Sequence, residues 1–440
     1  MKRILWVLVL LAFIIPVARF SIHNPVLPGD KPYADLLASQ TLNSRDFGIL
    51  AHPNLEFSVY RMFMFLLVPV FGELSPWLLS SLFLVLSGFL LWKILKREGV
   101  SDKISAIAVV LFAVSPFTLI SSSGNGSSAL IILGVLAFWW FMSINSYAVG
   151  LLSILALASI GRYPAMLAFG LVNVVARYHN INKTAKLLSY VVAFVFTVYY
   201  FLMPLNTVSG FVGLVEFGNI NGFSLFSLML ACLGAVAVWR LKNKYYRVYA
   251  LGFLAVAASF WIIQLRGVSA VILALLGAYA FDSLLRRKWH IKVIKPLTIL
   301  VICCGLLFAW VTSALILVHA EPTGYTQSVF SKLGRLNYAG VFVPPEYGRW
   351  VNYWAHKPVI ADRTFMKNSN STSAEVRMIM ESASLDDTLA EFYKYGIQYV
   401  VVLPQMIGSV WESRDEGLLF VLQNNQTFLQ LTSDIWLVAN

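Results

Sequence analysis

Acidic residues are scarce in this sequence. Aspartate and glutamate together number 21 in 440 residues, against 33 lysines and arginines, and all charged residues make up only 12% of the chain. A soluble domain carries about 25% charged residues. With 59% hydrophobic residues and a mean hydropathy of +0.74, the composition excludes an ordinary soluble enzyme or binding protein.

Several motifs of catalysis and binding are also absent. The three cysteines, Cys232, Cys303 and Cys304, all lie in apolar runs, which excludes a disulfide framework outside a membrane. The sequence has no phosphate-binding loop, no glycine-rich dinucleotide fingerprint, no zinc-protease motif and no nucleophile elbow. Its six histidines form no pair spaced for a metal on one helix face. These absences argue against the common nucleotide-dependent and zinc-dependent enzymes.

Long apolar runs are what the sequence has instead. Runs of nearly 20 residues recur, and each is long enough to cross roughly 30 Å of hydrocarbon as a helix. We predict a polytopic α-helical membrane protein with about eleven transmembrane helices. The run 57–71 is interrupted by Arg61, and we expect it to lie at the outer interface of the membrane. The predicted spans are 4–20, 76–95, 104–123, 128–144, 147–161, 163–177, 187–204, 223–240, 248–265, 268–285 and 296–318.

Basic residues set the predicted orientation. Residues 1–318 contain 24 basic and 9 acidic residues, a formal charge of +15, whereas the tail contains 9 basic and 12 acidic residues, a charge of −3. With eleven spans, four short basic loops fall on the same side as the N-terminus, as the positive-inside rule requires. We therefore predict a multi-pass protein of the cell membrane with a cytoplasmic N-terminus and no nucleic-acid partner. The four loops are 93–103, 176–186, 240–247 and 286–295.

The composition changes near residue 319, which predicts two domains. Residues 1–318 are expected to form a transmembrane domain with a large first outer loop at 21–75, and residues 319–440 a small extracytoplasmic α/β domain. The stretch 319–340 shows little periodicity, so we expect a linker there.

Local signals predict several elements of the tail. Ser384 is a good helix N-cap and Gly396 a good helix end, which predicts a helix between them. The apolar run 397–403 is typical of a buried strand. The last two apolar segments of the chain, TFLQLT and DIWLVAN, are expected to form a closing hairpin.

Five of the nine acids in residues 1–318 fall in the first outer loop. Pro28 and Gly29 predict a turn, Asp30 is a good N-cap, and Pro32 suits the first helical positions. A carboxylate held at a helix start beside an outer cavity can accept a proton from a hydroxyl. A purely structural role for these acids remains an alternative. The five are Asp30, Asp35, Asp46, Glu56 and Glu73.

The stretch GDKPYADLLASQ, residues 29–40, resembles the first outer loop of GT-C glycosyltransferases. These polytopic enzymes take sugars from polyprenyl-phosphate carriers, and they include the catalytic subunit of oligosaccharyltransferase. Their loop carries an acidic residue in a setting similar to Asp-x-x-Tyr-Tyr-x-x-x-x-Ala. Asp30, Tyr33 and Ala38 fit this pattern, whereas Ala34 replaces the second tyrosine.

Three further stretches carry the resemblance. Residues 52–72 are similar to the interfacial helix before the second span of these enzymes, and 113–123 to the end of the third span and the second outer loop. Residues 344–362 are similar to the stretch around the Trp-Trp-Asp-Tyr-Gly motif, which Glu346-Tyr347-Gly348 match loosely. Two departures stand out: Gly124-Asn125-Gly126-Ser127 has no carboxylate where an acidic pair is expected, and Pro344-Pro345 replace the two tryptophans.

The resemblance implies a GT-C-like fold and a membrane glycosyltransferase. Such an enzyme would transfer a sugar from a polyprenyl-phosphate donor in the membrane lipid to a glycan, lipid or protein acceptor on the outer face, with inversion. Asp30 is the expected general base, with Asp35 as a second candidate. The resemblance leaves open whether a divalent cation, Mg²⁺ or Mn²⁺, takes part. The candidate substrate-binding residues are Tyr33, Arg162, Arg266, Glu216, Glu346 and Arg349.

The arginines are candidates for a physical reason. Arg162 and Arg266 each lie at the outer end of a predicted span, where a charge is costly and often faces a cavity. A guanidinium also suits a phosphate in bidentate geometry. Two other functions stay open: a non-catalytic GT-C-like subunit in cell-envelope or glycan assembly, which the missing acidic pair favours, and a lipid or solute transporter.

Overall fold

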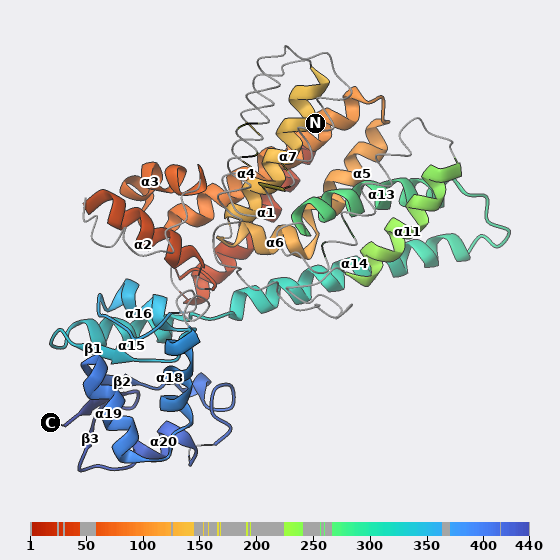
Figure 1. The fold of residues 1–440 in the computed structure, drawn as a ribbon. Helices are drawn as coiled ribbons and strands as arrows, with labels where there is room; N and C mark the ends of the chain where they lie inside the picture. The colour runs from red at the N-terminus through yellow and green to blue at the C-terminus, as the bar shows by residue number, and fades with distance from the viewer. Residues whose placement is uncertain are drawn as a thin grey trace. The chain divides into compact units, whose positions relative to one another are not determined.

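The computed structural model describes most of the chain in nine continuous stretches. They are 2–23, 26–29, 31–44, 59–124, 126–144, 224–240, 266–362, 370–413 and 415–439, with a few single positions between 153 and 259. The described residues form two compact units, whose elements are labelled in Figure 1. The first takes in residues of 1–27 and 56–320, and the second takes in residues of 28–41 and 321–440. We call them unit 1 and unit 2.

Unit 1 is built from apolar helices. Three helical stretches among the described residues are long and apolar enough to cross a membrane, namely Val59–Arg97, Arg266–Arg286 and Ile294–Gly334. This agrees with the predicted class of membrane protein. The helices are α1 (Lys2–His23), α3 (Val59–Phe71), α4 (Ser75–Arg97), α5 (Asp102–Ala113), α6 (Pro116–Ser122), α7 (Gly126–Ser143), α11 (Leu225–Arg240), α13 (Arg266–Arg286) and α14 (Ile294–His319), with a 3₁₀ turn η2 (Gly72–Leu74) after α3.

Helices occupy the predicted spans that fall among the described residues, with one difference. The predicted span 104–123 is divided into α5 and α6, which are bent by 61° at Val114 and Ser115. Ser115 is extended, with ψ of 133°, because a residue before proline avoids the helical region. Pro116 then starts α6. The predicted spans 147–161, 163–177, 187–204 and 248–265 lie outside the described residues, apart from single positions.

The helices of unit 1 pack closely along small residues. Helix α4 lies against α7, and α13 lies against both α5 and α11. A Cβ placed at Gly234 of α11 would be only 1.9 Å from the carbonyl oxygen of Leu276 in α13, so the two backbones touch there. Such contacts between small residues are the usual way in which helices associate in lipid.

One buried arginine joins the first and last long helices of unit 1. Arg19, near the end of α1, is only 1% exposed. Its guanidinium donates to the carbonyl oxygens of Val26 at 2.6 Å, Leu317 at 2.8 Å and Val318 at 3.0 Å. Leu317 and Val318 lie in the last turn of α14, whose carbonyls have no partner within the helix. Arg19 therefore satisfies them and also opposes the negative end of the helix dipole.

Unit 2 contains a four-stranded mixed sheet in the order β1-β2-β4-β3. Strand β1 (Gly340–Phe342) is parallel to β2 (Ile397–Val401), whereas β4 (Ile435–Val438) is antiparallel to both β2 and β3 (Phe428–Thr432). The helices are α2 (Lys31–Ser44, up to residue 41 in this unit), α15 (Gly324–Gly334), α16 (Gly348–Trp354), α18 (Asn370–Glu381), α19 (Leu385–Tyr395) and α20 (Gly417–Val421), with a 3₁₀ turn η4 (Pro404–Met406).

The predictions for the tail were right for the last strands and helix and wrong for its beginning. Helix α19 begins after the N-cap Ser384, whose hydroxyl accepts from the amide of Asp387, and it ends at the left-handed Gly396. The predicted strand and hairpin are confirmed as β2, β3 and β4. The expected linker 319–340 instead contains helix α15.

Helix α15 has a clear physical cause. The hydroxyl of Thr323 accepts from the amide of Thr326 and caps the helix, and Val329, Phe330 and Leu333 at helical spacing are buried.

Candidate functional site

The segment that begins at Pro28, after α1, is part of unit 2. Helix α2 presents a face of buried residues that includes Tyr33, which is only 1% exposed. The Tyr33 ring lies 5.2 Å from that of Tyr353 and 4.8 Å from that of Trp354, both in α16. This aromatic contact joins two segments that are more than 300 residues apart in the sequence. It also makes Tyr33 a packing residue of unit 2 in this structure.

Two hydrogen bonds hold Gly29, the residue before Asp30. Its amide donates to the carbonyl oxygen of Glu321 at 2.7 Å. Its own carbonyl oxygen accepts from the indole nitrogen of Trp350 at 3.3 Å. Gly29 has a φ of +81°, a left-handed conformation that glycine adopts at little cost. The chain is thus fixed on the N-terminal side of Asp30, and α2 begins directly after it at Lys31.

The structure describes only one of the two candidate catalytic residues. Asp30 lies outside the described residues. Asp35 is on α2 and is only 4% exposed, so this carboxyl group is buried. Burial of a carboxyl group costs free energy unless neighbouring groups stabilise it. Its burial therefore distinguishes Asp35 from an ordinary surface acid.

The loosely matched motif Glu346-Tyr347-Gly348 leads into helix α16. Glu346 is exposed, whereas Tyr347 is buried. Arg349 follows on the first turn of the helix, and its Nε lies 3.9 Å from Oδ2 of Asp362 with both side chains largely buried. A Cβ at Gly348 would be 2.6 Å from the carbonyl oxygen of Ala361. Only glycine allows this close approach of α16 to residues 361 and 362.

Burial and negative charge raise the pKa of Tyr347 to about 12. Loss of solvent is the larger cause, followed by the charges of Glu321 and Glu346. The phenol therefore stays protonated in the neutral range and can donate a hydrogen bond. Its ring meets that of Trp350 edge to face at 5.1 Å. Tyr347 thus belongs to the same group of contacts that holds Gly29.

The remaining candidates fall elsewhere. Arg266, the first residue of α13, is in unit 1, is 3% exposed, and donates from Nε to the carbonyl oxygen of Ser259 at 3.2 Å. Arg162 and Glu216 lie outside the described residues. The structure therefore brings Tyr33, Asp35, Glu346 and Arg349 into one unit and places Arg266 in the other.

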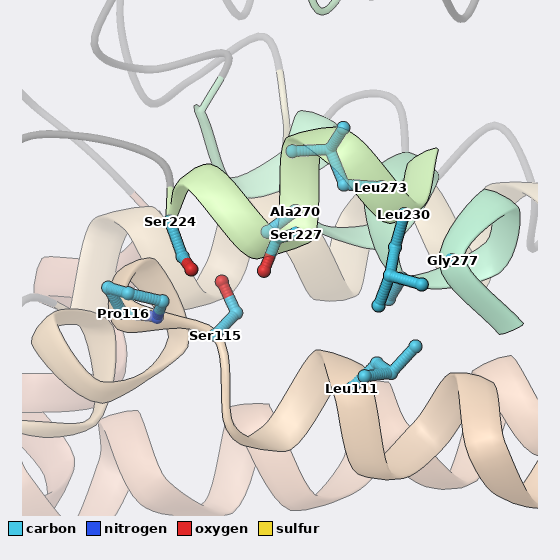
Figure 2. Close-up of a pocket in the computed structure, with 10 residues that line it drawn as sticks. Leu111, Ser115, Pro116, Ser224, Ser227, Leu230, Ala270, Leu273 and Gly277 are labelled. Atoms are coloured by element: carbon cyan, nitrogen blue, oxygen red, sulfur yellow. The ribbon is translucent and has the colours of Figure 1, made fainter. Parts of the chain in front are cut away.

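A small cavity lies in unit 1 where α5 breaks (Figure 2). Its volume is about 20 Å³, which is enough for roughly one water molecule. The hydroxyl groups of Ser115, Ser224 and Ser227 point into it from the α5–α6 break and from the start of α11. The cavity is much too small for a sugar phosphate, so we do not assign a substrate to it.

Metal-binding side chains do not gather in the part of the chain that the structure describes. No three of the described His, Cys, Asp and Glu residues lie close enough together to hold an ion. These described residues do not fit a metal site.

Sequence reasoning missed two residues that hold the candidate site. Trp350 and Glu321 both bond to Gly29, and neither was a candidate. Trp350 lies two residues after Gly348 in the stretch that carries the resemblance, so its place beside the motif was the one available signal.

Comparisons with known proteins support the fold. No protein-family model matches this sequence, and no curated protein matches it. Among solved structures, the apo oligosaccharyltransferase of Archaeoglobus fulgidus is similar, with a TM-score of 0.64 at 12% identity over 92% of this chain and 70% of that one.

Other oligosaccharyltransferase structures from Archaeoglobus fulgidus are also similar. The oligosaccharyltransferase AglB of Archaeoglobus fulgidus, in complex with an inhibitory peptide and a dolichol-phosphate, gives a TM-score of 0.64 at 11% identity over 100% of this chain and 74% of that one. A form tethered to an acceptor peptide gives 0.55 at 12% identity, over 92% and 69%. At such identities the likeness concerns the fold, and the chain has a GT-C-like membrane fold.

Proposed function

We propose that this protein is a membrane glycosyltransferase that takes a sugar from a polyprenyl-phosphate-linked donor. The proposal rests on one observation above all: the residues on both sides of Asp30 are built into unit 2, through the bonds of Gly29 and the packing of Tyr33. A loop that only connected two spans would not need this support. The GT-C-like fold adds to the proposal, because the solved structures with that fold are oligosaccharyltransferases.

The chemistry requires one base and one cationic group. In the proposed reaction, Asp30 accepts the proton of an acceptor hydroxyl while the hydroxyl oxygen attacks the anomeric carbon of the donor. The bond from that carbon to the phosphate oxygen breaks, and the polyprenyl phosphate leaves with the electron pair. Direct displacement inverts the anomeric carbon. Asp35 is the alternative base, although its burial in α2 limits contact with a substrate.

Candidate cations for the departing phosphate come from both units. In unit 2, the guanidinium of Arg349 lies beside the carboxylate of Asp362. In unit 1, Arg266 is buried at the start of α13. Both carry the planar guanidinium that binds phosphate oxygens in pairs. We propose Arg349 for the donor phosphate or acceptor in unit 2, with Glu346 and the protonated Tyr347 as neighbouring polar contacts. Arg162 and Glu216 remain proposals from the sequence.

The proposal is tested with purified protein in detergent and a panel of polyprenyl-phosphate sugars. Release of polyprenyl phosphate is measured for the native chain, for Asp30→Asn and for Asp386→Asn. Asp386 is an acid in the first turn of α19, so its substitution makes the same chemical change outside the proposed site. We expect Asp30→Asn alone to lose turnover. Equal turnover in all three proteins would remove Asp30 from the mechanism.

A second candidate function is a non-catalytic relative with the same fold. One observation favours it, at the place where the resemblance calls for a second acidic motif. A Cβ at Gly126 would lie 1.9 Å from a ring carbon of Tyr60, so the Tyr60 side chain fills the space beside the start of α7. A larger residue does not fit there. Absence of turnover with every donor and acceptor, together with copurification of a separate glycosyltransferase, would support this alternative.

A further inference from the structure

The segment between α13 and α14 is basic and largely exposed. Residues 287–293 connect two helices that are both apolar enough to cross a membrane, so by length and composition the segment lies at a membrane boundary. Arg287, Lys288 and Lys292 are all exposed. We call these three residues the basic loop triad. None of the three forms an ion pair with a carboxylate of the described residues.

Other cations at this end of unit 1 do form ion pairs with carboxylates. Lys96 pairs with Asp102, and both Lys103 and Arg286 pair with the buried Asp282, at 3.3 Å and 2.7 Å. The carboxylates of Asp102 and Asp282 are thus already paired with cations on α4, α5 and α13. The charge of the basic loop triad is left for an anion from outside this part of the chain.

Aromatic and aliphatic side chains of the same segment suit a lipid interface. The indole nitrogen of Trp289 donates to the carbonyl oxygen of Leu284 at 3.2 Å, one of the last carbonyls of α13. The guanidinium of Arg287 lies over the Trp289 ring, 5.6 Å from its centre. Ile291 and Val293 are 58% and 70% exposed. Tryptophan and exposed apolar groups beside basic residues are typical of segments that lie among lipid headgroups.

From these observations we infer that the basic loop triad binds the headgroups of anionic phospholipids. The negative charge of the lipid phosphate complements the triad, and Ile291 and Val293 enter the boundary between headgroups and acyl chains. Each lysine or arginine near an anionic membrane surface contributes about a fivefold change in affinity. Removal of three such charges should therefore weaken binding roughly 100-fold. This inference does not depend on the glycosyltransferase proposal.

The test compares two lipids and three forms of the full chain in detergent. Phosphatidylglycerol or phosphatidylcholine is titrated in, and bound lipid is counted by native mass spectrometry. The loop variant carries Arg287→Gln, Lys288→Gln and Lys292→Gln. The control carries Lys332→Gln, Arg335→Gln and Arg377→Gln, three exposed cations of unit 2 with the same total charge change.

We expect phosphatidylglycerol to bind the native chain and the control alike, and the loop variant roughly 100-fold more weakly. Phosphatidylcholine should bind all three weakly. Equal phosphatidylglycerol binding by the loop variant and the control would overturn the inference, as would equal binding of the two lipids.

A measurement on the native chain guards against a loop variant that fails to fold. Binding of phosphatidylglycerol should fall when NaCl is raised to about 0.5 M, because salt screens exposed charges. A charge-conserving variant, Lys288→Arg with Lys292→Arg, should bind as the native chain does. Salt-independent binding of phosphatidylglycerol would mean that the acyl chains are recognised instead, which contradicts the proposal.

Discussion

The indole nitrogen of Trp350 donates a hydrogen bond to the carbonyl oxygen of Gly29 at 3.3 Å. These two residues are 321 positions apart in the chain, and both belong to unit 2. Gly29 directly precedes Asp30, the proposed general base. Helix α16 of the tail therefore supports a loop that begins at the end of the first span, and the tail has a part in any chemistry at that loop.

Substitution of Trp350 by phenylalanine removes this donor while an aromatic ring is kept. A hydrogen bond of this kind contributes on the order of 1 kcal/mol, which corresponds to about a fivefold change in an equilibrium or a rate. Under the proposed function we expect turnover to fall at least about fivefold, with a smaller change in KM, because the acceptor and donor contacts remain. The measurement is release of polyprenyl phosphate at varied acceptor concentration.

Trp354 on the same helix provides a matched control. Its indole nitrogen is buried and has no hydrogen-bond partner among the described residues. Trp354→Phe loses the same ring area and reduces the ring that packs on Tyr33, but it removes no hydrogen bond to Gly29, so its turnover should fall less than that of Trp350→Phe. If the two variants lose turnover equally, the effect comes from packing in α16 and not from the support of Gly29.

Gly348 should not tolerate alanine. The added methyl group would lie 2.6 Å from the carbonyl oxygen of Ala361 and 3.1 Å from the Cα of Asp362, so the backbone must move. Overpacking of this kind costs about 1–3 kcal/mol. We expect Gly348→Ala to lower the Tm by several degrees, whereas Asn352→Ala, at a half-buried position of the same helix, should change it less. Equal Tm values for Gly348→Ala and the native protein would mean that this contact is looser than described.

Tyr347 should make the protein less stable at high pH. Its pKa is about 12 in the folded protein and about 10 in the unfolded chain, so the folded state holds the phenol proton more tightly. This contribution to stability is fully present below pH 10 and is lost as the pH rises from 10 to 12.

The alkaline effect is measured as the change in Tm between pH 9 and pH 11.5, in the native protein and in Tyr347→Phe. Because other tyrosines and lysines also titrate, the quantity of interest is the difference between the two proteins. We expect the native protein to lose more Tm than Tyr347→Phe over this range. The same loss in both would show that Tyr347 is more solvated than its burial indicates.

The predicted orientation is open to a labelling test with single cysteines. In a background with the three native cysteines replaced by serine, Ala383→Cys in the exposed turn before α19 should react with an impermeant reagent in intact cells. Lys288→Cys, in the segment between α13 and α14, should react only after lysis. The reverse result would invert the orientation, and reaction of both in intact cells would contradict the single predicted span, 296–318, that separates the two positions.

The sequence predicted elements that depend on local signals. Helix α19 is an example, since Ser384 and Gly396 mark its ends by chemistry that acts within a few residues. Helix α15 had the same kind of signal in Thr323, but polar residues and glycines around it hid the helical spacing of its apolar side chains. The break at Ser115 and Pro116 was missed because apolar composition alone continues through it.

The support of the candidate site could not be predicted, because it depends on contacts between distant residues. The sequence identified the stretch before α2 and the stretch around Gly348 separately, through a resemblance. The aromatic contact of Tyr33 with α16 and the bond from Trp350 to Gly29 require the folded chain. Apolar runs specify which residues enter lipid, but they contain no information on which polar backbone atoms will meet.

Arg19 has a consequence for the order of synthesis. Two of the three backbone carbonyls that its guanidinium contacts belong to Leu317 and Val318. These two hydrogen bonds can form only after nearly three quarters of the polypeptide has been synthesised. Until the ribosome has delivered those carbonyls, the nascent protein lacks two of the backbone acceptors that Arg19 contacts in the folded chain. Chains that stop short of residue 317 should therefore be recognised and degraded by the membrane quality-control machinery, even though most of their helices are already present.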